Sequence, residues 1–443
     1  MNVRIRLNVW SLRVRFAASL LALCLLPFGF GGCVSSTDQN PTNRITLEFW
    51  TLQMDAFKST LEPMFLDYER EHPNIHIRWV DVPFSEGPKR TLTAMMSGHT
   101  PDVINLNPDF SAILANRHAL LDMNRVLPAE RRASYLPVAW QAATLDQAKG
   151  RPLAFGLPWY VTSSVTLYNK ELLKKAGYTT PPDSFAQLPR FAQAVRDKAH
   201  AYGLMPVITE NGNFLKALQK AGIRLYNEKG RAVFATGPAV DMLAHYVELY
   251  HSGWVPAEAI TESHQAAVGR FQAGTLATLQ VGPNFLKIVK ENAPEVYRET
   301  GVAPQFPKET AMKDFALMLL VVPVKSAHPQ EAVDFAAFIT NADNQLALAK
   351  AAPVLPSVTE ALKNDYFQLP SSGKSHIPPD LMSQGRSISA AQLLSAKVAY
   401  RIKPGQNAIN EIMDHYVQLA MLGKITPPAA LSRAQQEINA TLE

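Results

Sequence analysis

The stretch Ile45-Thr46-Leu47-Glu48-Phe49-Trp50 alternates apolar and polar residues, which predicts a β-strand with one buried face. A helical pattern follows over about 57–70, and residues 75–80 (Ile-His-Ile-Arg-Trp-Val) then alternate in the same way. A second helix is predicted over about 89–96 and a third strand over 101–106. Strand, helix, strand, helix, strand with short connections favours parallel βαβ units, so we expect an α/β fold.

The same alternation of elements resumes later in the chain. The segment Phe315 to Val324 is almost continuously apolar, as a strand buried on both faces should be. The length of 443 residues, at roughly 150 residues per domain, predicts two or three domains. Further strands are expected over 152–158, 164–168 and 275–281, and helices over 170–176, 185–198, 238–250, 263–272, 329–350, 410–422 and 428–442.

The N-terminus has the plan of an export signal. An apolar run from Phe16 to Phe30 follows a basic head, and no acidic residue occurs before Asp38. The run is shorter than the roughly 20 residues of a membrane span and is interrupted by Pro27 and glycines. Gly31 and Gly32 directly before Cys33 resemble the end of a bacterial lipoprotein signal, in which the cysteine receives a diacylglycerol and becomes the new N-terminus. We expect a signal peptide at 1–32, lipidation at Cys33 and a tether at 33–43; an ordinary cleaved signal is the alternative.

This signal changes the interpretation of the net charge and of the thiols. The chain carries a formal +5, and removing the four arginines of residues 1–32 leaves 5 − 4 = +1. Cys24 leaves with the signal and Cys33 is lipidated, so the mature chain offers no thiol for disulfides, zinc or nucleophilic catalysis. HExxH, GxxxxGK[ST] and GxSxG motifs are absent from the sequence. We therefore expect no metal, no cofactor and no nucleic-acid partner.

A series of short motifs, in a fixed order, identifies a family. The strand at 45–50 is followed by a helix ending in His72-Pro73-Asn74-Ile75, and Leu167-Tyr168-Asn169-Lys170 begins another matching segment. The matching segments are 45–50, 65–75, 96–103, 119–122, 167–177, 271–274, 328–335 and 423–431. Together they resemble the extracellular solute-binding proteins of bacterial ABC importers, in the sugar-binding branch that includes maltose-binding protein. The resemblance covers essentially everything after the signal.

This resemblance implies a periplasmic binding protein fold, with two α/β lobes hinged around an interlobe cleft. It places lobe 1 at 44–156 plus 315–352, and lobe 2 at 157–314 plus 353–443. It also implies a monomeric binding protein without catalytic activity. Such a protein would be exported, anchored to the cell membrane on its periplasmic or extracellular face, and would deliver a sugar or oligosaccharide to ABC permease subunits.

Sugar binding requires aromatic rings for the apolar faces of the sugar and amides, carboxylates or arginine for its hydroxyls. In open α/β sheets such groups lie on loops at the carboxyl ends of strands. By the resemblance, Asp109 occupies a position where relatives often supply a carboxylate, and Asn284 or Phe285 must serve where relatives often place a stacking tryptophan. The candidate ligand-binding residues are Trp50, Gln53, Asp55, Asn107, Asp109, Phe110, Trp159, Tyr160, Thr162, Glu210, Asn211, Asn213, Asn284, Phe285, Tyr400 and Arg401.

Several of these candidates have a structural alternative. Trp50 could be a core residue at the end of a strand, and Asn211 and Asn213 could serve only the turn around Gly212. Trp159 and Tyr160 are adjacent, so their side chains point apart, and both seldom enter one core. We therefore expect one of them to reach the ligand, and Trp159→Ala to lower affinity.

Other functions remain open at this point. The same scaffold serves glycerol phosphodiesters and other polar solutes, but an anionic ligand would require several basic residues in the cleft, and only Arg401 can be placed there. An exported glycosidase or polysaccharide lyase is the enzymatic alternative, since paired carboxylates are not recognisable by spacing. A cell-envelope interaction module without a small ligand is a third. The segment 302–314 also lacks the glycine pair that relatives often carry before the next strand.

Overall fold

The computed structural model describes residues 44–145, 151–308, 310, 312–368, 380–397 and 405–442. The contacts within Arg44–Glu443 make this segment one compact unit. The signal, the tether, Cys33, Tyr400 and Arg401 lie outside the described residues, so the predictions made for them rest on sequence alone. Among the described helices, none has the length and apolar content needed to cross a bilayer.

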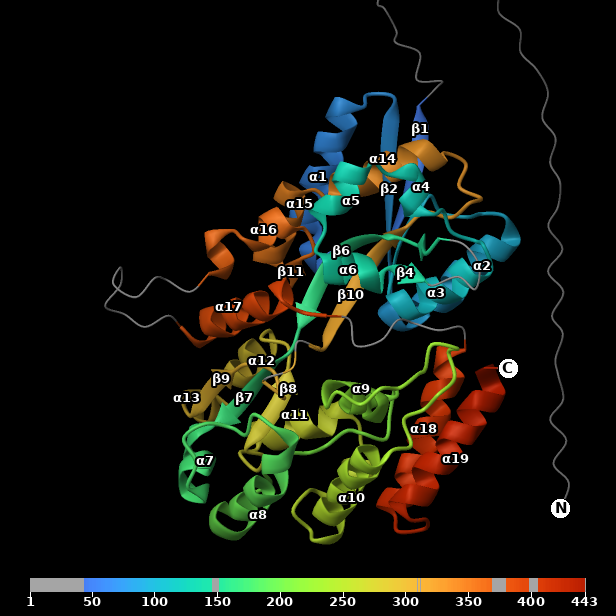
Figure 1. Cartoon of the computed structure of the whole chain (residues 1–443). Coiled ribbons are helices and arrows are strands. Elements are labelled where there is room, and N and C mark those ends of the chain that lie inside the picture. Colours follow the sequence, from blue (N-terminus) through green and yellow to red (C-terminus); the bar gives the residue numbers. More distant parts are fainter. Residues whose placement is uncertain are drawn as a thin grey trace, which may run out of the picture. The chain divides into compact units, whose positions relative to one another are not determined.

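A six-stranded sheet forms the first lobe (Figure 1). β1 (Ile45–Leu52) pairs in parallel with β2 (Ile75–Val82) and with β3 (Val103–Leu106), which confirms the βαβ prediction for these strands. β10 (Phe315–Val321) runs antiparallel to β3 and to β6 (Leu157–Ser163). The short β11 (Leu355–Pro356) completes the order β11-β6-β10-β3-β1-β2.

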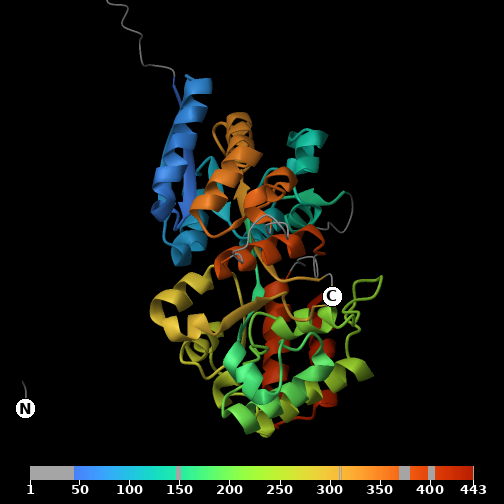
Figure 2. The same cartoon turned by 90° about the vertical axis from the view of Figure 1, so that its left-hand side faces the viewer.

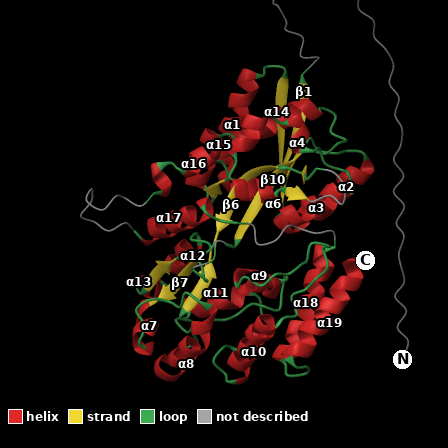
Figure 3. Cartoon of the chain, in the orientation of Figure 1, coloured by secondary structure: helices red, strands yellow, loops and turns green. Residues whose placement is uncertain are grey.

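Helices cover both faces of this sheet (Figure 3). On one face, α1 (Lys58–Glu71) contacts α14 (Pro329–Ile339) and α15 (Ala342–Ala351), and these helices lie side by side in Figure 2. Beneath them the ring of Phe49 meets those of Phe65 and Phe335 edge to face, and the latter two are tilted against each other, with centroids 5.4 to 6.1 Å apart. The opposite face carries α2 (Gly87–Ser97) and α3 (Pro108–Asn116). Successive residues of β1 therefore point alternately toward the two layers of helices, as the alternation in the sequence predicts.

Short elements complete the first lobe. α4 (Met123–Val126), α5 (Ala129–Ser134) and α6 (Pro137–Ala142) lead into the hairpin of β4 (Thr144–Leu145) and β5 (Leu153–Ala154). The helix expected over 329–350 is two helices, because the Asn341 side chain accepts a hydrogen bond from the Asn344 N–H at 2.8 Å and so starts α15 anew.

The second lobe has a three-stranded antiparallel sheet in the order β8-β7-β9. Its strands are β7 (Val165–Asn169), β8 (Thr278–Val281) and β9 (Thr300–Ala303). Its helices are α7 (Lys170–Ala176), α8 (Leu188–Ala199), α9 (Asn213–Lys220), α10 (Gly237–His251), α11 (His264–Gln272), α12 (Phe285–Asn292), α13 (Pro294–Arg298), α18 (Gln406–Met421) and α19 (Pro427–Leu442). α9, α10, α18 and α19 share one apolar core.

The chain passes between the two sheets at Ser164, between the end of β6 and the start of β7. α17 (Leu381–Leu394) holds this crossing with buried polar side chains. The Ser389 hydroxyl donates to the Ser163 carbonyl at 2.8 Å, and the Gln392 amide donates to the Ser164 carbonyl at 3.2 Å. These two carbonyls lie where β6 ends and β7 has not yet begun, so α17 supplies hydrogen-bond donors for them in place of a neighbouring strand.

The strand pairings favour boundaries between the two lobes that differ from those expected from the sequence. All of β6 (157–163) pairs within the first sheet, and so does β11, which follows residue 352. α16 (Thr359–Leu362) and the 3₁₀ turn Asp365–Phe367 also place Leu362 and Phe367 in the first core. We therefore propose lobe 1 as 44–163 plus 315–368, and lobe 2 as 165–314 plus 405–442, with α17 between them.

Candidate ligand-binding site

A carboxylate of lobe 1 interacts electrostatically with an ammonium group of lobe 2. Asp109 lies in the first turn of α3, which begins where the Asn107 side chain accepts from the Phe110 N–H at 2.8 Å. The Asp109 side chain is exposed, yet the surrounding protein desolvates it enough to raise its pKa, an effect that the charge of Lys216 on α9 partly offsets. The charge interaction joins residues of both lobes, so we take Asp109 and Lys216 as the starting point of the candidate interlobe site.

The turn before α9 positions Lys216. Asn211 and Gly212 both have left-handed backbone (φ 55 and 63), and a Cβ on Gly212 would collide with Asn410. The Asn213 amide donates to the Val207 carbonyl at 2.9 Å, and Lys216 Nζ donates to Asn213 Oδ1 at 3.1 Å. The turn therefore fixes an amide and an ammonium group next to each other.

Asp414 on α18 ties this turn to the C-terminal helices. Its carboxylate accepts from the Gly212 N–H, with N···O distances of 3.1 and 3.2 Å. The pKa of Asp414 is raised to about 6. Burial is the largest cause and the charge of Glu210 adds to it, whereas the N–H groups of Gly212 and Asn211 and the charge of Lys216 act in the opposite direction. Asp109 and Asp414 thus both interact with the charge of Lys216, and Glu210 interacts with that of Asp414.

An imidazole and a phenyl ring adjoin the same group. Burial lowers the pKa of His264, at the start of α11, and the charge of Glu210 opposes this effect. The His264 ring meets the Phe285 ring edge to face, with centroids 6.2 Å apart. A cavity of about 260 Å³ is lined by Asn213, Lys216 and His264 together with mostly apolar side chains of lobe 2. The site therefore combines amides, charged groups and an aromatic ring, the set that recognises a hydroxylated ring.

The structure brings five of the predicted residues into this group: Asp109, Glu210, Asn211, Asn213 and Phe285. Sequence reasoning missed Lys216, His264 and Asp414. Asp414 lies 202 residues from Gly212 in the chain, so no local pattern could have connected them. Lys216 lies three residues after Asn213 on a helix, and that spacing was the one available signal.

A second group of predicted residues surrounds the turn after β1. The Asp81 carboxylate accepts from the N–H groups of Met54 (2.9 Å) and Asp55 (3.0 Å), which shapes this turn and leaves Gln53 exposed. The Tyr160 hydroxyl donates to Met54 Sδ at 3.8 Å. Burial and the charge of Asp81 raise the pKa of Tyr160 to about 12, so its hydroxyl stays protonated. Gln53, Asp55 and Tyr160 therefore share one corner of lobe 1.

Two predicted aromatic residues are core residues in this structure. Trp159 is 1% exposed and Phe110 9% exposed, each in an apolar cluster of lobe 1. Trp159 is buried because helices cover both faces of β6. Phe110 is buried because it lies on the side of α3 that packs into the apolar cluster of the sheet. The expectation that Trp159 offers a ring to the ligand is not supported by this position.

No described contact joins the side chains of Thr162, Asn284 or Trp50 to the interlobe group. Thr162 is half-buried in β6, opposite Ala316, and Asn284 is half-buried immediately before α12. Trp50 is half-buried and lines a different pocket, within lobe 1. Within the described ranges, no group of three or more His, Cys, Asp or Glu side chains could hold a metal ion.

The sequence profile of the bacterial extracellular solute-binding proteins matches residues 53–346. The chain belongs to this family. A "putative oligosaccharide periplasmic-binding protein" from Synechococcus sp. MITs9220 has a crystal structure similar to this solute-binding protein, with a TM-score of 0.80 and 32% identity over 89% of this chain and 98% of its own. The "Putative ABC transporter periplasmic-binding protein YcjN" of Escherichia coli K12 is 22% identical over 447 residues, 96% of this chain and 97% of the relative.

A further relative carries the word lipoprotein in its name. The "Uncharacterized lipoprotein in oleD 5'region" of Streptomyces antibioticus is 25% identical over 370 residues, 80% of this chain and 78% of the relative. The family and its solved structures confirm the two-lobed periplasmic binding protein fold for this solute-binding protein.

Proposed function

We propose that this protein is the substrate-binding component of an ABC importer. It binds a sugar or oligosaccharide between its lobes without altering it, and delivers it as a monomer to the membrane permease. The observation that carries this proposal is the cavity beside Lys216 of lobe 2, together with the charge interaction between Lys216 and Asp109 of lobe 1. A ligand that bridges both groups stabilises the closed arrangement of the lobes, which is how a hinged receptor signals occupancy. The names of the Synechococcus and E. coli relatives support the same role.

The charges around the site favour an uncharged polyol over a phosphodiester. Asp109 and Asp414 both interact with the charge of Lys216, and Glu210 interacts with that of Asp414. Lys220, the other lysine of the cavity, is already paired with Asp314. An added phosphate would therefore meet more carboxylates than unpaired ammonium groups. Sugar hydroxyls donate to carboxylates and accept from an ammonium group, so they suit this mixed set. A glycerol phosphodiester is therefore the weaker of the two ligand classes.

Export and lipid anchoring complete the proposal. The basic head, apolar run and Cys33 predict a lipoprotein held on the periplasmic or extracellular face of the cell membrane. The lipoprotein name of the Streptomyces relative supports this expectation.

Lys216→Met tests the ligand site. Titration calorimetry with a panel of mono- and oligosaccharides identifies the ligand of the wild-type protein, and we expect the variant to bind it about 10- to 100-fold more weakly, since a hydrogen bond to a charged group contributes about 1.5–3 kcal/mol. Lys175→Met is the control, because Lys175 is an exposed lysine of lobe 2, 52% exposed and paired with Glu171. A panel without any ligand, or equal losses in both variants, contradicts the proposal.

Product analysis separates the receptor from an enzyme. We expect glycans incubated with the purified protein to be recovered intact, and new reducing ends or unsaturated termini would identify a glycosidase or lyase instead.

A further inference from the structure

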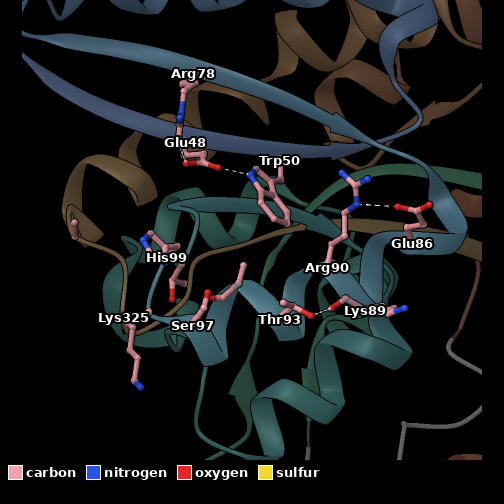
Figure 4. Close-up of a pocket in the computed structure, with 14 residues that line it drawn as sticks. Glu48, Trp50, Arg78, Glu86, Lys89, Arg90, Thr93, Ser97, His99 and Lys325 are labelled. Atoms are coloured by element: carbon pink, nitrogen blue, oxygen red, sulfur yellow. Dashed lines mark hydrogen bonds and ion pairs between the residues drawn. The ribbon is translucent and has the colours of Figure 1, made fainter. Parts of the chain in front are cut away.

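Lobe 1 contains a second pocket, which is larger than the cavity beside Lys216. Its volume is about 860 Å³, and every residue that lines it belongs to lobe 1. One wall is the sheet face from which Glu48, Trp50 and Arg78 project. Glu48 and Arg78 are paired in register and so point to the same side, whereas Phe49, between Glu48 and Trp50, points to the other side, toward α1. The opposite wall is α2 (Figure 4). The loops at 97–100 and 325–327 close one end.

The indole of Trp50 is held in place at this wall. Its Nε1 donates to Glu48 Oε1 at 2.5 Å, and the other Glu48 oxygen accepts from Arg78 Nη2. Trp50 packs on the apolar core with one side and remains half-buried, so it also lines the pocket. An oriented indole beside a carboxylate and a guanidinium provides an apolar platform with donors and acceptors at its rim, which suits a sugar ring.

The pocket carries an excess of positive charge. Arg78, Lys89, Arg90 and Lys325 contribute +4, and Glu48 and Glu86 contribute −2, which leaves 4 − 2 = +2. Arg90 extends from α2 toward the sheet (Figure 4) and donates through Nε to Glu86 at 2.8 Å, so its Nη groups keep donors for another acceptor. Among the residues that the structure describes, the ammonium groups of Lys89 and Lys325 have no hydrogen-bond or ion-pair partner. These donors call for a negatively charged group on the ligand.

We propose that this pocket binds a sugar ring that carries a carboxylate, a hexuronate residue, independently of the interlobe site. The ring lies on Trp50, its hydroxyls meet Glu48 and the α2 side chains, and its carboxylate takes the free guanidinium donors of Arg90. The same chain would then hold a uronate-containing glycan on lobe 1 while the interlobe site stays available for the transported solute.

Arg90→Gln tests this site. The mature protein is titrated at low ionic strength, where charge attraction is least screened, with methyl glucuronide, methyl glucoside and inorganic phosphate. Because the interlobe site can itself take a neutral sugar, the readout is the part of the binding that Arg90→Gln weakens. We expect an about tenfold loss for the glucuronide and no change for methyl glucoside or phosphate, since only the glucuronide makes a charge-assisted bidentate contact with Arg90. Arg70→Gln is the matched control: both arginines are exposed, on helices of lobe 1 and in local ion pairs, but only Arg90 lines the pocket.

Each other outcome overturns the proposal. Absence of glucuronide binding, an equal dependence of methyl glucoside or phosphate binding on Arg90, or an equal loss in Arg70→Gln would each show that the pocket lacks this specificity. Lys216→Met separates the two sites: it should leave glucuronide binding unchanged. If it removes that binding while Arg90→Gln keeps it, the uronide occupies the interlobe site, and the proposed transport function stands without the second pocket.

Discussion

The indole of Trp159 lies edge to face against the rings of Phe49 and Tyr160, at centroid separations of 6.0 and 5.2 Å, and is 1% exposed. Trp159→Ala would remove this ring from a closely packed core. We expect the variant to lose about 3–5 kcal/mol of unfolding free energy, measured by denaturant titration, while the folded fraction keeps its affinity for the sugar.

Trp159→Phe is the control for this prediction, since it keeps an aromatic ring in the same site and should lose less stability. The contrary result is an Ala variant with unchanged stability and weakened sugar binding, which would return Trp159 to the ligand site.

Single side chains were the least predictable feature of the site, and β6 shows why. Adjacent residues of a strand point to opposite faces, so Trp159 and Tyr160 suggested one core residue and one ligand residue. In β6 both faces are covered, which buries Trp159 and leaves Tyr160 half-buried beside Met54. Sequence alternation reports which face a residue occupies, but the helices that cover the face come from residues 58–71 and 329–351.

At the scale of elements, Asp414 links α18 to the turn before α9, and its pKa makes this link pH-dependent. The pKa rises from an ordinary 3.8 to about 6 in the folded protein. The folded state therefore holds this proton more tightly than the unfolded state, so the associated stability is present below about pH 4 and is lost as the pH rises through about 6.

Asp414→Asn tests this assignment, because Asn keeps an acceptor for the Gly212 N–H and cannot ionise. We expect the difference in unfolding free energy, variant minus wild type, to grow by on the order of 2 kcal/mol between about pH 4 and pH 7. Asp241→Asn, which removes an exposed carboxylate from α10 of the same lobe, controls for the change in net charge. A difference that is constant with pH would contradict the assignment.

The elements with strong periodicity were predictable, and those with a polar buried face were not. β1, β2 and the C-terminal helices lie close to their predicted ranges because their apolar residues repeat with the period of the structure. α17 was missed, since Gly385, Ser387 and Ser389 weaken its helical pattern and are buried all the same. They are buried because α17 packs on the crossing at Ser164, a tertiary requirement that leaves no local periodic signal.

At the scale of the whole molecule, the separation of the two pockets limits what ligand binding can do. The interlobe site draws residues from α3, α9, α11 and α18, so a ligand there acts on both lobes. The pocket beside Trp50 draws on lobe 1 alone, and its occupant has no differential contact with open and closed arrangements of the lobes. We therefore expect an occupant of this pocket neither to compete with the interlobe sugar nor to drive closure of the lobes. Binding of the interlobe sugar is expected to drive closure.

The proposed attachment of the molecule to its membrane rests on Cys33, and Cys24 provides an internal comparison. Both cysteines lie within the first 33 residues, but only Cys33 follows the small residues Gly31 and Gly32. We expect Cys33→Ala to move the protein from the membrane fraction to the soluble exported fraction, as measured by fractionation and by the mass of the mature N-terminus. Acyl chains contribute about 0.8 kcal/mol per buried CH₂, so their loss leaves no comparable membrane affinity in a mature chain of net charge near +1.

Cys24→Ala should stay anchored, because that residue is removed with the signal; release of both variants, or of neither, would mean that Cys33 is not the lipid attachment site.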